Sequence, residues 1–72
     1  MRFFVFMRIT VNGELFDAQK SETLADLLKE LGMRPERLAV EINMSIVKKA
    51  DYAICLLKEG DSIEIVNFVG GG

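Results

Sequence analysis

Hydrophobic and polar positions alternate from residue 3 to residue 11, where every second side chain is apolar: Phe3, Val5, Met7, Ile9 and Val11. Because the run is rich in aromatic and β-branched residues, this alternation predicts a strand. Asn12-Gly13 follows directly, and this pair strongly indicates a tight hairpin because both turn positions need positive φ. Residues 14–18 are therefore expected to form the return strand of a β-hairpin.

The leucines between residues 24 and 31 follow a helical pattern. Leu24, Leu27, Leu28 and Leu31 recur at the spacing of one apolar helix face. Thr23 and Asp26 fit a variant of the capping box at the start, and Gly32 is the expected stop. We expect a helix of about 8–9 residues, which must lie on a sheet because so short a helix is not stable alone.

The second half of the chain predicts further strands. Residues 38–42 and 62–66 read as strands, with a turn near residues 43–45 and short apolar runs at 46–47 and 54–57. A hairpin followed by a helix and more strands is an α+β arrangement of two layers. The first expectation is a β-grasp (ubiquitin-like) fold, with a mixed sheet of four to five strands and one main helix on one face. The pattern alone leaves other small α+β rolls open.

The organisation that follows is one domain and a tail. Residues 1–66 are expected to form a single β-grasp domain, in which residues 1–6 are a possible extension. Residues 67–72 are expected to be a flexible C-terminal glycine tail. If the first and last strands are parallel, as in a β-grasp sheet, the tail should leave near the Asn12-Gly13 turn.

Composition narrows the class of partner and the compartment. The chain has 72 residues and a net charge of −2, with acidic and basic residues interspersed. The absence of a basic stripe argues against nucleic acid and anionic membranes. A single Cys forbids an internal disulfide, and no apolar run is long enough to span a bilayer. We therefore expect a cytoplasmic protein, and a monomer.

The chemistry of a stand-alone enzyme is missing. There are 0 His residues, which excludes Ser-His and Cys-His nucleophilic systems. A zinc site would need four donors from one Cys and scattered carboxylates, so no metal site is expected. Cys55 lies in an apolar run and is interpreted as a small buried core residue. The chain is predicted to be a carrier or binding protein that holds no cofactor.

The chain ends on Phe68-Val69-Gly70-Gly71-Gly72. A terminal carboxylate is ionised at neutral pH, so it becomes an acyl donor only after activation, for example as an adenylate formed with ATP. Glycines let the backbone enter a confined pocket that side chains would block. At about 3.3–3.6 Å per residue, residues 68–72 reach about 17 Å. The alternative interpretation is an inert, frayed end.

The residues resemble the ThiS family of sulfur carriers in thiamine biosynthesis over nearly the whole chain. The opening of this family is similar to residues 7–13, its helix to Thr23-Leu24 with Leu27-Leu28, and its middle strands to residues 40–43 and 46–47. The most specific block is Leu57-Lys58-Glu59-Gly60-Asp61 through Ile65-Val66, followed by Phe68-Val69-Gly70-Gly71-Gly72.

The resemblance implies a mechanism and partners. An E1-like adenylyltransferase would use ATP to adenylate the Gly72 carboxylate. Sulfur from a cysteine desulfurase would then convert it to a thiocarboxylate, which thiazole synthase would use for the thiazole ring of thiamine. The expected partner-binding residues are Val66, Phe68, Val69, Gly70 and Gly71. Two alternatives keep the same fold: a carrier for another pathway, such as molybdopterin synthesis, and a ubiquitin-like protein modifier.

Two features depart from the family pattern. Asn43-Met44 stands where the family often has Asn-Gly. A tight primed turn would force Met44 to positive φ, which is unfavourable for a residue with a Cβ, so we expect a wider turn or another type. Residues 1–6 precede the usual family start, so Met7 is an alternative initiator and the extension is predicted to be dispensable.

Overall fold

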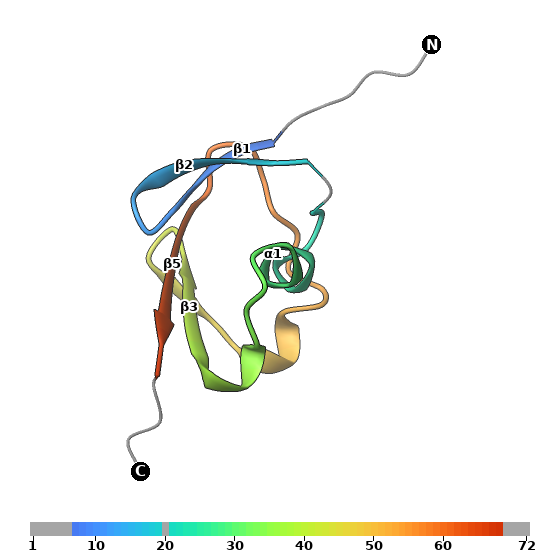
Figure 1. Ribbon diagram of the computed structural model, residues 1–72, viewed down its shortest axis with the longest axis vertical. Coiled ribbons are helices and arrows are strands. Elements are labelled where there is room, and N and C mark those ends of the chain that lie inside the picture. Colours follow the sequence, from blue (N-terminus) through green and yellow to red (C-terminus); the bar gives the residue numbers. More distant parts are fainter. Residues whose placement is uncertain (1–6, 20, 69–72) are drawn as a thin grey trace.

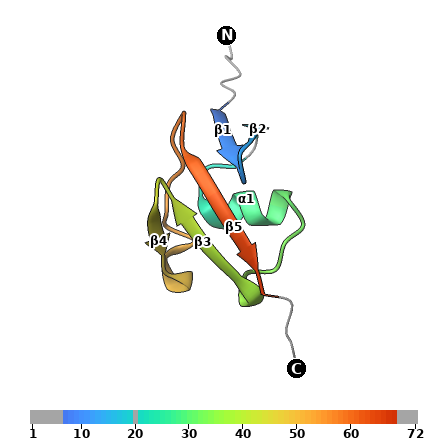
Figure 2. The same ribbon diagram turned by 90° about the vertical axis from the view of Figure 1, so that its left-hand side faces the viewer.

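One mixed sheet with the strand order β2-β1-β5-β3-β4 dominates residues 7–19 and 21–68, which are the residues that the computed structural model describes. The strands are β1 (Met7–Val11), β2 (Glu14–Ala18), β3 (Leu38–Ile42), β4 (Ser45–Val47) and β5 (Ser62–Asn67). The helix α1 (Leu24–Glu30) covers one face (Figures 1 and 2). This is the predicted mixed sheet with one main helix.

The first hairpin forms as its sequence predicts. Asn12 and Gly13 have φ of 51° and 84°, and Val11 pairs with Glu14 across a two-residue loop. Both central residues therefore adopt the left-handed conformation that a primed turn requires. The alternation also holds, because Ile9 is buried whereas Arg8 is exposed.

Local signals fix both ends of α1, which is slightly shorter than expected, at seven residues. The Thr23 hydroxyl accepts from Asp26 N at 3.1 Å, and the Asp26 carboxylate accepts from Thr23 N at the same distance. At the other end Gly32 has φ 72°, while Met33 N donates to the Leu28 carbonyl at 2.8 Å. These are the predicted capping box and a Schellman stop.

The second hairpin contradicts the expectation of a wider turn. β3 and β4 pair with Ile42 opposite Ser45, so Asn43 and Met44 alone form the loop, with φ of 51° and 71°. The Asn43 side chain donates to Asp61 Oδ1 and accepts from Ser62 N, both at 2.9 Å. These bonds tie the turn to the start of β5, so tertiary contacts hold Met44 in an unfavourable conformation.

The core lies between α1 and the sheet. Its fully buried large side chains come from both layers: Ile9, Leu24, Leu27, Leu28, Val40 and Ile63. Cys55, expected inside the core, is only partly buried against it. Burial, followed by the charges of Asp61 and Asp51, raises the pKa of the Cys55 thiol above its ordinary value. This thiol is therefore mostly protonated at neutral pH.

The described part of the chain contains two single-turn 3-10 helices, η1 (Pro35–Arg37) before β3 and η2 (Lys49–Asp51) after β4. Lys49 Nζ donates to the Glu36 carbonyl at 2.8 Å, which joins the two turns at the end of the sheet where β5 ends (Figure 2). None of the helices in the described residues has the length and apolar character needed to cross a membrane.

Candidate functional site at the end of the last strand

β5 is the central strand and leads directly into the tail. It runs parallel to β1, with Thr10 opposite Ser62, and antiparallel to β3. Beyond Val11, where β1 ends, β5 continues to Asn67, which pairs with Leu38. Phe68 N then donates to the Arg37 carbonyl at 2.8 Å. The tail therefore starts beside η1, several residues beyond the Asn12-Gly13 turn where it was expected.

Side chains alternate along β5 between the core and the outer face of the sheet. Ile63 and Ile65 are 0% and 7% exposed, whereas Val66 is 53% exposed and Phe68 58% exposed. Val66 lies opposite Ala39 of β3. Because the Ala39 side chain is small, Val66 stands out from the surface. The two candidate docking residues thus lie outside the core, at the end of β5.

An acidic pair lies next to this apolar surface. Glu64 of β5 is directly opposite Glu41 of β3, and Ile46 of β4 is opposite Glu41 on the other side. All three side chains are exposed. Two carboxylates opposite each other repel. A docking partner with basic groups here would remove that repulsion.

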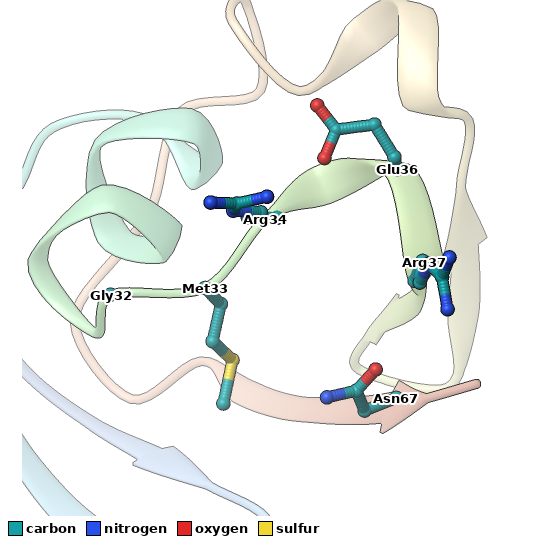
Figure 3. Close-up of a pocket in the computed structure, with 6 residues that line it drawn as sticks. All are labelled: Gly32, Met33, Arg34, Glu36, Arg37 and Asn67. Atoms are coloured by element: carbon teal, nitrogen blue, oxygen red, sulfur yellow. The ribbon is translucent and has the colours of Figure 1, made fainter. Parts of the chain in front are cut away.

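A hollow of about 520 Å³ lies on the other side of the tail root, lined by Gly32, Met33, Arg34, Glu36, Arg37 and Asn67 (Figure 3). Met33 and Asn67 lie along its lower side, and Arg34 and Arg37 on its flanks. Among the described residues, no carboxylate oxygen lies within 4.0 Å of either guanidinium. The hollow is therefore a basic site adjacent to the point where the tail begins.

The remaining candidate residues, Val69, Gly70, Gly71 and Gly72, lie outside the described residues. Sequence reasoning missed the hollow, because Arg34 and Arg37 come from η1 and its flank while Asn67 comes from β5. No spacing in the sequence indicates that they meet. Among residues 7–19 and 21–68, no three Cys, Asp or Glu side chains gather closely enough to hold a metal ion.

Comparison with known proteins identifies the family. The ThiS family model matches residues 5–72. The chain is 29% identical over 66 residues to the sulfur carrier protein ThiS of Escherichia coli, covering 92% of this chain and 100% of that protein. It is 46% identical over 66 residues to a thiazole synthase of Magnetococcus marinus, again over 92% of this chain. The match spans only 20% of the length of that enzyme and of a second thiazole synthase.

A solved structure confirms the predicted fold. The crystal structure of the thiamine biosynthesis protein ThiS from Geobacter metallireducens superposes with a TM-score of 0.77 at 30% identity. The superposition covers 92% of this chain and 100% of that one. The five-stranded sheet with one covering helix is therefore the β-grasp architecture of that protein.

Proposed function

Because the chain belongs to the ThiS family, we propose that it is a sulfur carrier of thiamine biosynthesis whose working group is the terminal carboxylate of Gly72. The observation that carries the proposal is the family match, which extends to the last glycine. The position of β5 supports it, since the central strand delivers the tail from a firmly paired part of the fold.

The chemistry requires activation by a second protein. A carboxylate oxygen of Gly72 attacks the α-phosphate of ATP, and pyrophosphate leaves. A sulfide equivalent, supplied from a cysteine desulfurase, then attacks the acyl carbon and displaces AMP, which leaves a thiocarboxylate. The carrier itself supplies no acid, base or metal in these steps. Its own contribution is a narrow backbone that enters a confined active site and a surface that is recognised.

Val66 and Phe68 are the proposed docking residues for the E1-like adenylyltransferase. Both are more than half exposed, and both stand where the body ends and the tail begins. Exposed apolar side chains commonly mark partner surfaces, and aromatic side chains dominate interface energies. The neighbouring Glu41 and Glu64 lead us to expect basic residues on the facing surface of the partner.

Thiazole synthase is the proposed acceptor of the sulfur. In two relatives named thiazole synthase, a segment similar to this chain makes up 20% of the polypeptide. A segment of this kind within the same chain as the rest of such an enzyme supports a functional partnership. The same matches favour thiamine biosynthesis over molybdopterin synthesis or protein modification.

Intact-mass measurement tests the proposal. The chain is incubated with a ThiS-system adenylyltransferase, ATP and a sulfide source. The expected product gains the mass difference between one sulfur and one oxygen, and only when ATP is present. A matched chain with one alanine added after Gly72 should fold normally and gain nothing. Sulfur loading of the extended chain would rule out the terminal-carboxylate mechanism, and an isopeptide-linked adduct would indicate a modifier.

A further inference from the structure

The basic hollow beside the tail root has no function in the steps above. Arg34 and Arg37 flank it without a carboxylate of the described residues within 4.0 Å. Arginine binds carboxylates through paired N–H groups in a planar fork. The Asn67 amide adds a donor on the lower side of the hollow (Figure 3). The donor set therefore fits a single carboxylate.

The chain has a carboxylate within reach. Phe68 is fixed by its hydrogen bond to the Arg37 carbonyl at 2.8 Å, so the four residues after it start at the rim of the hollow. Fully extended they would span about 13–14 Å, which exceeds what a return to the rim requires. Two adjacent glycines, Gly70 and Gly71, can take the positive φ of a tight reversal. Such a reversal would direct Gly72 back toward Arg37.

We propose that the hollow is a binding site for the chain's own Gly72 carboxylate, which would hold the tail against the body until a partner takes it. The tether makes weak exposed pairs sufficient, because a short flexible linker gives an effective concentration in the millimolar range. This proposal rests on the proposed function for its purpose, since a docked carboxylate must be released before activation.

The charges around the hollow favour a carboxylate that arrives from the β5 side. The Glu36 carboxylate lies on the opposite side of the hollow from Asn67 (Figure 3). Lys49, from η2, contributes a further positive charge nearby, where its ammonium binds the Glu36 carbonyl. The net charge of Arg34, Glu36, Arg37 and Lys49 is positive, whereas the whole chain is negative at −2.

Amidation of the C-terminus tests the site without any partner enzyme. The full chain is prepared with Gly72 as the acid and as the carboxamide, which removes the charge and keeps the length. At neutral pH, amidation should shift the NMR signals of the Arg34 and Arg37 Nε–H groups and the Asn67 side-chain amide. The shifts should disappear in 1 M salt, where the Debye length is about 3 Å. The Arg8 Nε–H, paired with Asp17 at 3.3 Å, is the internal reference that should not move.

Charge removal supplies the matched control. In the double variant Arg34→Gln with Arg37→Gln, the tail amide signals of the acid should move to their positions in the amidated chain. Lys29→Gln with Lys58→Gln removes the same charge away from the hollow and should leave them unchanged. Identical spectra for acid and amide would overturn the proposal, as would shifts that vanish on tenfold dilution, because these indicate the tail of another copy. Sulfur loading is measured separately, so either idea can fail alone.

Discussion

The side chain of Asn12 hydrogen-bonds both backbone groups of Ile65: Ile65 N donates to Oδ1 at 2.7 Å, and Nδ2 donates to the Ile65 carbonyl at 3.3 Å. β1 has ended one residue earlier, at Val11. The amide of Asn12 therefore takes the place of the next peptide group in the parallel ladder. One residue both forms the hairpin turn and holds β5 on its path to the tail.

Replacing Asn12 separates these two roles. Asn12→Gly keeps a residue that accepts positive φ but removes both bonds to Ile65. At roughly 0.5–1.5 kcal/mol per hydrogen bond, we expect a loss of about 1–2 kcal/mol in the free energy of unfolding, measured by urea titration. Exchange of the Ile65 amide should accelerate while that of Ile9 keeps pace with global stability. Unchanged exchange at Ile65 would show that these bonds do not hold the strand.

The strained turn at Met44 should be improved by glycine. Met44 has φ 71° and a side chain that is 92% exposed, so glycine removes strain of about 1–2 kcal/mol without losing packing. Part of this gain is offset by the greater freedom of glycine in the unfolded chain. We expect Met44→Gly to raise the free energy of unfolding by about 0.5–1 kcal/mol. Met44→Ala keeps the strain and should give no such gain; equal effects of the two would contradict the explanation.

The docking surface should be separable from the core. Phe68→Ala and Val66→Asp remove exposed side chains, so the free energy of unfolding should stay within about 1 kcal/mol. Binding to the adenylyltransferase, measured by calorimetry, should weaken by about 2 kcal/mol for Phe68→Ala. Ile65→Ala, on the buried face, is the control and should lose roughly 2–5 kcal/mol of stability. A collapsed melting curve for Phe68→Ala with unchanged affinity would mean that Phe68 stabilises the fold and does not dock.

The opposed carboxylates of Glu41 and Glu64 predict a stabilising charge reversal. Glu64→Lys creates an opposite-charge pair across β3 and β5, which should add roughly 0.2–1 kcal/mol to the free energy of unfolding. Glu41→Lys should act similarly, and the double variant should return to the wild-type level because two lysines repel again. The same single variants should weaken docking if the partner presents basic groups. An additive double variant would show that the pair does not interact.

The capping box makes stability depend on pH. Hydrogen bonds from Thr23 N, then Glu22 N, then the Thr23 side chain lower the pKa of Asp26 below its ordinary 3.8. A lowered folded-state pKa stabilises the fold above pH 3.8 and loses that contribution as pH falls through the folded value. The stability difference between wild type and Asp26→Asn should therefore shrink in acid. Thr23→Ala, which removes one of these bonds, should reduce the same pH dependence and cost about 1 kcal/mol at neutral pH. A difference that stays constant with pH would contradict this origin.

Features set by neighbouring residues were predictable from the sequence. Asn12-Gly13 specifies its turn through positive φ, and Thr23 with Asp26 specifies the helix start through two reciprocal bonds. The alternation along β5 also separated Ile65 from Val66 correctly, because the side-chain period of a strand is fixed.

Features set by distant residues were not predictable. The turn at Met44 follows from the bonds that Asn43 makes with Asp61 and Ser62, 18 and 19 residues away. Local preference disfavours this conformation, and tertiary pairing overrides it. The hollow likewise forms only because β5 ends beside η1, which brings Asn67 to Arg34 and Arg37.

The central place of β5 has a mechanical consequence. Any partner that draws the tail inward while the body rests against its surface puts β5 under tension along its axis. Ladder hydrogen bonds to β1 and β3 lie across that axis, so the load is shared in shear among several bonds and does not peel them one at a time. The carrier can thus be pulled by its reactive end through the strand that is best able to resist the force.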